Sequence, residues 1–196
     1  MRDEKARIRR EVAELYRKLP AEELAERGAQ ARARLAAADE FRRAGSFLLY
    51  ASLPDEIDTA PLIDELLAAG KAVYLPVCRP GRAEIDVVPI RSRGADLAPG
   101  HFGILEPRPG LAPAIAGDVQ FALVPGRAFD RRGRRLGRGR GYYDRFLLAL
   151  PAGVTRAALA LGFQILPAVP AAEHDQPVDL VATDRELIRV RPEPGP

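Results

Sequence analysis

We predict an α/β fold for this chain: a single three-layer domain with a mostly parallel central sheet flanked by helices. Apolar runs of strand length recur at residues 46–50, 72–75, 121–124 and 155–161. A helical pattern at residues 61–69 separates the first two runs, and a strand–helix–strand unit pairs its strands in parallel with a right-handed crossover. A chain of 196 residues, 47% of them hydrophobic, suits one large domain.

We place this domain at residues 1–190 and expect a disordered tail at residues 191–196. The formal net charge of +3 is too small to indicate nucleic acid as the partner. The charged start lacks the apolar segment of a signal peptide, and no run approaches the length of a membrane span. The single cysteine, Cys78, follows an apolar run and is expected to be buried. We therefore expect a soluble monomer of a reducing cytoplasm that acts on small molecules.

Two helices are predicted at the start of the chain, at residues 3–19 and 22–37. The first carries an apolar stripe, which consists of Ile8, Val12, Leu15 and Leu19. At about 100° per residue, Lys5, Arg9 and Tyr16 fall together on one flank of this stripe, where the two cations can border a groove. An ordinary solvated helix would show the same charge pattern, so the pattern alone does not establish a site.

The most informative stretch lies between the strand at residues 121–124 and a helix that begins at Tyr142. Its glycines alternate with arginines in the order Gly137, Arg138, Gly139, Arg140 and Gly141. A strand, a glycine-rich loop and the first turn of a helix favour phosphate binding, because backbone N–H groups and the helix start attract anions. A flexible loop or a basic RNA-binding segment fits the same residues. The loop lacks the Lys-Ser/Thr ending of a P-loop, so a metal ligand must be a carboxylate such as Asp144.

The stretch RLGRGRGYYDRFL, residues 135–147, resembles the signature of the 5-formyltetrahydrofolate cyclo-ligase family. Three other segments resemble this family in the expected order, namely YASLPDEIDT, HFGILEP and VPAAEHDQPVDLVAT. The resemblance extends from Lys5 to about residue 184. One departure is that many relatives have a glycine-only loop where this chain has Arg138 and Arg140, which can alter nucleotide preference.

The resemblance implies which residues bind the nucleotide. An N-terminal K-x-x-x-R pair contacts ATP in the family, and Lys5 and Arg9 match it. The expected ATP-binding residues are Lys5, Arg9, Arg135, Leu136, Gly137, Arg138, Gly139, Arg140, Gly141, Tyr142 and Tyr143. We assign Arg140 the catalytic role of stabilising charge as the phosphoryl group moves. Either tyrosine could instead be a core residue at the start of the helix. Of the two, we expect only Tyr142 to contact the folate in addition to ATP.

The resemblance also implies a folate site and a magnesium site. Glu56 and Ala51 follow the first predicted strand and are expected to bind the folate, because a carboxylate can accept the adjacent N–H donors of a pterin ring. Asp144 and Asp179 are expected to hold Mg²⁺, which binds one or two carboxylates together with substrate phosphate. We place Glu106 near the site and give the His174–Asp175 pair a structural or site-bordering role.

The reaction that the resemblance implies is the ATP-dependent closure of 5-formyltetrahydrofolate to 5,10-methenyltetrahydrofolate. In the family the formyl oxygen attacks the γ-phosphate of ATP, N10 closes on the carbon, and ADP and phosphate are released. Two alternatives stay open from the residues alone. One is a nucleic-acid-binding module that uses the basic strip as its contact surface. The other is a different enzyme, such as a sugar-phosphate isomerase, on a similar scaffold.

Overall fold

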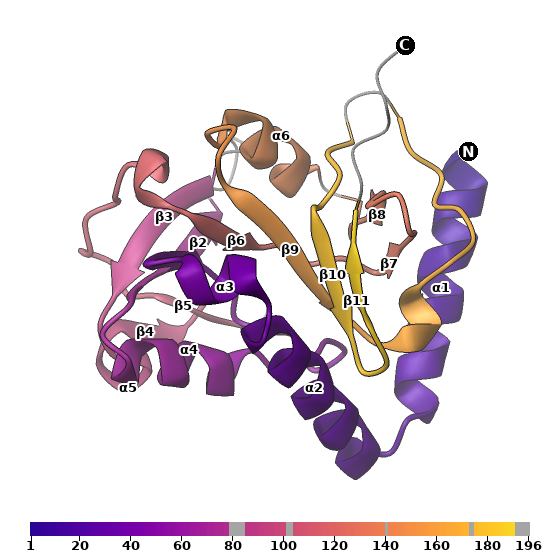
Figure 1. Cartoon of the computed structure of the whole chain (residues 1–196), viewed down its shortest axis with the longest axis horizontal. Coiled ribbons are helices and arrows are strands. Elements are labelled where there is room, and N and C mark those ends of the chain that lie inside the picture. Colours follow the sequence, from indigo (N-terminus) through magenta and orange to yellow (C-terminus); the bar gives the residue numbers. More distant parts are fainter. Residues whose placement is uncertain (79–84, 101–103, 140, 173–174, 191–196) are drawn as a thin grey trace.

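A computed structural model of the chain describes residues 1–78, 85–100, 104–139, 141–172 and 175–190 (Figure 1). Its centre is a seven-stranded sheet with the strand order β11-β10-β9-β6-β1-β2-β3. The strands are β1 (Ser46–Leu48), β2 (Ala72–Cys78), β3 (Ile85–Ile90), β6 (Phe121–Leu123), β9 (Thr155–Ala160), β10 (Leu180–Thr183) and β11 (Leu187–Arg189). The run from β10 to β2 is parallel, and an antiparallel strand closes each edge. The predicted mostly parallel sheet is confirmed.

The remaining elements surround this sheet. The helices are α1 (Arg2–Lys18), α2 (Ala21–Ala36), α3 (Asp39–Arg43), α4 (Ala60–Ala68), α5 (Arg93–Asp96) and α6 (Tyr142–Ala149), with 3₁₀ turns η2 (Ala116–Asp118) and η3 (Gly162–Gln164). Two antiparallel pairs complete the set: β4 (Leu97–Pro99) with β5 (Leu105–Pro107), and β7 (Ala128–Phe129) with β8 (Arg135–Leu136). Within the described ranges, we find no helix that combines the length and apolarity of a membrane span.

Alternating side chains give the sheet two buried faces, as the period of a strand requires. In β6, Phe121 and Leu123 pack into one hydrophobic cluster, whereas Ala122 and the following Val124 pack into a second. Helices α1 to α4 contribute to the first cluster and α6 to the second. Helices therefore cover both faces, which makes the three layers that the sequence predicts.

The first helix is rotated relative to the predicted stripe. Its buried residues are Ile8, Val12 and Tyr16, while Leu15 is 43% exposed. Tyr16 is buried instead because its ring packs edge-on against Phe163 at 5.2 Å and its hydroxyl has an interior partner. The helix thereby turns inward the flank that carries Lys5 and Arg9, which are both partly buried.

The expectation that Cys78 is buried is wrong. Cys78 is exposed at the end of β2. Strand β1 pairs with β2 only as far as Leu48 and Tyr74, so the last residues of β2 extend beyond the sheet with β3 as their neighbour. The apolar run predicts the strand correctly, but it does not predict where pairing with β1 ends and the strand becomes exposed.

A tight turn at Gly133 joins β7 to β8 and leads into the glycine loop. Gly133 has φ +76°, and its carbonyl accepts a hydrogen bond of 2.9 Å from the N–H of Val178. A Cβ at this position would lie 2.2 Å from the Val178 carbonyl oxygen. Glycine is therefore required both for the backbone conformation and for the close approach of the segment before β10.

We predict that Gly133→Ala lowers the free energy of unfolding by roughly 2–4 kcal/mol, from left-handed strain and backbone overlap together. The matched control is Gly110→Ala, since Gly110 also has a positive φ, +99°, but open space around its Cβ position. The control should lose only about 1 kcal/mol. Urea denaturation measures both values, and equal losses would contradict the role given to the Val178 contact.

Candidate active site

The candidate site is built from loops that follow neighbouring strands of the sheet. Strand β6 lies between β1 and β9 and is parallel to both. The loops after these three strands, residues 49–59, 124–141 and 161–169, therefore leave the same edge of the sheet. Ligands of open parallel sheets bind beyond the carboxyl ends of the strands. The predicted folate and phosphate segments are the first two of these loops.

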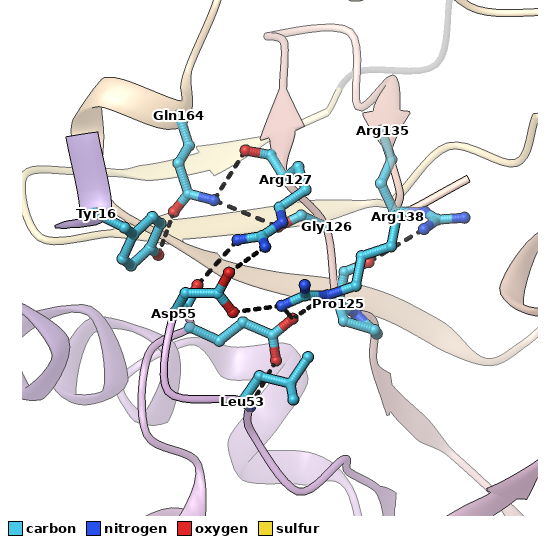
Figure 2. Close-up of polar contacts among 10 residues, drawn as sticks. Tyr16, Leu53, Asp55, Pro125, Gly126, Arg127, Arg135, Arg138 and Gln164 are labelled. Carbon is cyan, nitrogen blue, oxygen red and sulfur yellow. Dashed lines mark hydrogen bonds and ion pairs between the residues drawn. The ribbon is translucent and has the colours of Figure 1, made fainter. Parts of the chain in front are cut away.

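Four alternating charges join the loop after β1 to the loop after β6. Arg138 Nη2 lies 2.6 Å from Asp55 Oδ1 and 2.9 Å from Glu56 Oε1. Arg127 donates to the carboxylate of Asp55 and, at 3.1 Å, to its carbonyl oxygen. Figure 2 shows Asp55 lying between Arg127 and Arg138. The glycine loop and Glu56 thus face each other across one site, as the sequence predicts.

Two charges of this cluster, those of Asp55 and Arg138, are stabilised in the ionised form by their neighbours. Burial raises the pKa of Asp55, but hydrogen bonds from Arg127 and Arg138 outweigh it, so this pKa lies below its ordinary value. Burial lowers the pKa of Arg138, and the nearby Asp55 and Glu56 carboxylates reverse that change and raise it. The second oxygen of Glu56 accepts a bond of 3.0 Å from the N–H of Leu53. The two oxygens of Glu56 are thus oriented by Arg138 on one side and by the Leu53 N–H on the other.

A buried hydrogen-bond network adjoins the cluster at Arg127 (Figure 2). The hydroxyl of Tyr16 donates to Gln164 Oε1 at 2.8 Å, and Gln164 Nε2 donates to the carbonyls of Arg127 at 3.1 Å and Gly126 at 3.3 Å. Burial raises the pKa of the Tyr16 hydroxyl, which therefore remains a donor. This network ties α1 and η3 to the start of the loop after β6.

The N-terminal pair of cations reaches the glycine loop from α1. Arg9 Nε donates to the carbonyl of Gly137 at 2.8 Å. Gly139 has φ +95°, and a Cβ there would lie 3.3 Å from the Arg9 guanidinium, so glycine allows the close approach. Lys5 Nζ binds Asp175 Oδ2 at 2.7 Å, which ties α1 to the segment before β10. The structure brings together the two segments that the sequence predicts to bind triphosphate.

Arg135 binds one of the two carboxylates predicted to hold Mg²⁺, that of Asp144. This buried residue donates to the carboxylate of Asp144 and, at 3.1 Å, to the carbonyl of Pro125. Its Nε is buried and has no hydrogen-bond partner among the described residues. Arg135 and Asp179 line the same cavity of about 1080 Å³, together with Asp175. Asp179 therefore borders a hollow lined by arginines, and Asp144 is paired with one of the arginines of that lining.

The chemistry of these donors fits magnesium. Mg²⁺ usually binds one or two carboxylates, keeps several waters and takes its other ligands from substrate phosphates. Asp179 Oδ2 accepts a bond of 2.7 Å from the N–H of Arg156, which orients this carboxylate. Across the ranges that the structure describes, no cluster of three or more His, Cys, Asp or Glu side chains is found. Any cation bound by Asp144 and Asp179 would thus depend on phosphate oxygens.

Other predicted site residues lie at different depths. Leu136 is fully buried in β8, and Ala51 is partly buried after β1. Tyr142 opens α6 and is partly buried. Tyr143 packs against Phe146 with ring centroids 6.4 Å apart, and burial raises the pKa of its hydroxyl. These contacts favour a core role for Tyr143, whereas Tyr142 lies directly after the glycine loop, at the first position of α6.

Three predictions concern residues on which the geometry says less. Arg140, to which we assign charge stabilisation, and His174 lie outside the described residues. Glu106 belongs to the short strand β5, where it pairs with Ala98 of β4, rather than to the loop expected there. Its proximity to the site stays a prediction.

Sequence reasoning missed Asp55, Arg127 and Gln164 as parts of the site. Asp55 precedes Glu56 directly, and Arg127 stands three residues after the strand that feeds the glycine loop. A signal for these two was present, because a charged residue at either place must find a partner near the carboxyl ends of the strands. Gln164 carries no such signal, since its amide group donates to backbone carbonyls and its side-chain partner, Tyr16, is 148 residues away.

Comparison with known proteins identifies the family of this chain. A family model described as the 5-formyltetrahydrofolate cyclo-ligase family matches residues 1–184. The chain is 36% identical over 143 residues to the 5-formyltetrahydrofolate cyclo-ligase of Mycolicibacterium smegmatis, and this alignment covers 71% of this chain and 73% of the relative. It is 30% identical over 183 residues to the 5-formyltetrahydrofolate cyclo-ligase of Mus musculus, and this alignment covers 89% of this chain and 90% of the relative.

Solved structures show the same relationship. The NMR structure of Aquifex aeolicus 5,10-methenyltetrahydrofolate synthetase matches with a TM-score of 0.84 at 32% identity, covering 97% of this chain and 95% of that one. A 5,10-methenyltetrahydrofolate synthetase from Mycoplasma pneumoniae matches with a TM-score of 0.74 at 19% identity, covering 92% and 99%, and shares the fold. The chain therefore belongs to the 5-formyltetrahydrofolate cyclo-ligase family.

Proposed function

We propose that this enzyme closes 5-formyltetrahydrofolate to 5,10-methenyltetrahydrofolate, using Mg-ATP and releasing ADP and phosphate. One observation carries the proposal: the glycine loop contacts Glu56 through Arg138 and contacts α1 through Arg9. A carboxylate suited to a pterin and a cationic loop suited to phosphate are thus adjacent. The proposal includes a monomer that acts on small molecules in a reducing cytoplasm.

The chemistry needs these two ligands side by side. The formyl oxygen of the folate is a poor leaving group from an amide-like carbon. In the proposed reaction this oxygen attacks the γ-phosphorus of ATP, and ADP leaves with the electrons of the broken P–O bond. N10 then bonds to the activated carbon and loses its proton, and inorganic phosphate leaves with the former formyl oxygen. Reacting atoms must therefore be brought within contact distance, a task of positioning.

The protein residues contribute binding and charge rather than a covalent nucleophile. Glu56 would accept the pterin N–H groups, while Lys5, Arg9, Arg135 and the loop at residues 137–141 would bind the triphosphate. Backbone N–H groups and forked arginine donors suit the oxygens of phosphate. Tyr142 at the start of α6 would border the folate, and Arg140 would balance charge on the moving phosphoryl group.

Magnesium would be held by Asp144 and Asp179 together with phosphate oxygens. When bound, Mg²⁺ neutralises phosphate charge and orients the transferred group. Arg135, which binds Asp144, then serves to orient that carboxylate and to add a fixed positive charge beside it. Family membership and the Asp55–Glu56 carboxylates beside the loop disfavour the nucleic-acid alternative, because carboxylates repel a phosphodiester backbone.

The first prediction is ATP-dependent product formation. Protein mixed with Mg-ATP and 5-formyltetrahydrofolate should form methenyl product, which is followed by its near-ultraviolet absorbance. Omitting ATP, or chelating the metal with EDTA, should abolish the signal, and adding Mg²⁺ back should restore it. Turnover without ATP would support the isomerase-like alternative and exclude the proposed reaction.

The second prediction separates the two faces of α1. Arg9→Met should raise the KM for ATP by about tenfold or more, since a charged hydrogen-bonding partner of the loop is lost. Arg7→Met is the matched control, because Arg7 makes an exposed surface pair with Glu11 at 2.7 Å. The control should keep a KM within about twofold of the parent value. If both variants behave alike in steady-state kinetics, the role of Arg9 is wrong.

The third prediction concerns the glycine loop. Arg140→Ala should reduce kcat by about 10²- to 10³-fold, the usual loss when one charge-stabilising group of a transition state is removed. Arg145→Ala serves as control, because Arg145 is exposed on α6. Single-turnover measurements with saturating Mg-ATP would show the loss in the chemical step. An unchanged rate for Arg140→Ala would remove it from the catalytic assignment.

A further inference from the structure

Arg127 is a buried cation that none of the proposed ligand contacts uses. We propose that Arg127 is a positioning residue, which holds the turn bearing Glu56 through Asp55 and so sets the apparent affinity for the folate but not for ATP. This inference rests on the proposed folate role of Glu56. It concerns how the shape of the site is maintained, since Arg127 contacts Asp55, the residue before Glu56, and not Glu56 itself.

The contact between Arg127 and Asp55 fixes both the backbone and the side chain of one residue. Arg127 Nη1 donates to the Asp55 carbonyl at 3.1 Å, and Nη2 donates to the Asp55 carboxylate. The Arg127 side chain is 8% exposed and that of Asp55 is 37% exposed, so water reaches this contact mainly from the Asp55 side. A planar fork with two separate donors can bind both oxygens at once, whereas a lysine presents a single ammonium group.

Fixing Asp55 fixes Glu56 because both belong to one closed turn. The N–H of Glu56 donates to the carbonyl of Leu53 at 3.0 Å, and the N–H of Leu53 donates back to Glu56 Oε2 at 3.0 Å. Asp55 lies inside this reciprocal turn. A displacement of Asp55 would therefore move the carboxylate of Glu56 or break one of the two bonds that orient it.

Arg127 is itself anchored on two sides. Its N–H donates to the carbonyl of Leu136 at 2.7 Å, and its carbonyl accepts from Gln164 Nε2 at 3.1 Å. The Leu136 bond belongs to the same hairpin that leads into Gly137. Arg127 therefore sets the spacing between the Glu56 turn and the glycine loop, because its backbone is held by Leu136 and Gln164 while its side chain binds Asp55.

Arg138 binds the same turn but is a weaker anchor. Its side chain is 38% exposed, compared with 8% for Arg127. Exposed ion pairs contribute little because solvent screens them, whereas removing one partner of a buried pair leaves a costly uncompensated charge. The contacts of Lys5 and Arg9 run to Asp175 and Gly137 instead, so loss of the Arg127 contact leaves the nucleotide side in place.

The test compares kinetic constants for the two substrates. Arg127→Met keeps the length of the side chain and removes the fork, and it should raise the KM for 5-formyltetrahydrofolate by about tenfold, with the KM for ATP within about twofold. Arg127→Lys should restore part of the loss. Asp55→Asn, which keeps the carbonyl contact, should shift the same constant in the same direction by less.

The matched control is Arg32→Met. Arg32 also donates to a carbonyl of this loop, at 2.8 Å from Asp58 O, but from the surface and outside the Leu53–Glu56 turn. Both KM values should remain unchanged in this variant. Thermal unfolding is measured for every protein, and if Arg127→Met is unfolded at the assay temperature, the decision passes to Arg127→Lys and Asp55→Asn.

The outcomes distinguish this inference from the function on which it rests. An unchanged folate KM in the Arg127 and Asp55 variants, with a raised folate KM in Glu56→Gln, overturns the positioning role and leaves the proposed function intact. Equal increases in both KM values would mean a general structural loss and would also overturn it. No change in Glu56→Gln would instead refute the folate assignment of Glu56.

Discussion

The site depends on a pairing of charges between two loops whose paired residues are 72 to 83 positions apart in the sequence. Arg127 and Arg138 come from the segment after β6, and Asp55 and Glu56 from the turn after β1. Each carboxylate is bound by arginine, and Asp55 is bound by both. Positive and negative side chains alternate in this cluster, so each side chain lies beside a partner of opposite charge. The loops are thus locked to each other rather than merely close.

Sheet topology makes this pairing possible. The strand order puts β6 directly between β1 and β9, and all three run in the same direction. Their loops therefore leave the sheet side by side, and α1 crosses beside them with Arg9 on the glycine loop and Tyr16 on Gln164 (Figure 1). The apolar alternation in β6 provides the rigid base, since Phe121 and Leu123 are completely buried.

Local patterns predicted the parts of the fold that depend on neighbours in sequence. The β1–α4–β2 unit and the central β9 follow from apolar runs and a helical pattern between the first two of them, and the proximity of Glu56 to the glycine loop follows from parallel strands. Partners far apart in sequence leave no periodic signal. For that reason the inward turn of α1 toward Tyr16, the exposure of Cys78 and the Arg127–Asp55 contact emerged only from the structure.

Arg138 stands where many relatives have a glycine-only loop, and it binds two carboxylates of the opposite loop. Its fork binds Glu56 Oε1 at 2.9 Å and Asp55 Oδ1 at 2.6 Å, so this departure from a glycine-only loop contacts the carboxylate that we propose binds the folate. A pterin that presents two N–H donors to Glu56 needs both carboxylate oxygens, one of which Arg138 holds. Asp55 is bound by Arg127 as well as by Arg138, whereas the ion pair of Glu56 is with Arg138. The Asp55 carboxylate therefore keeps an arginine partner if either contact is lost, and the position of Glu56 depends more directly on Arg138 and on the turn that holds it.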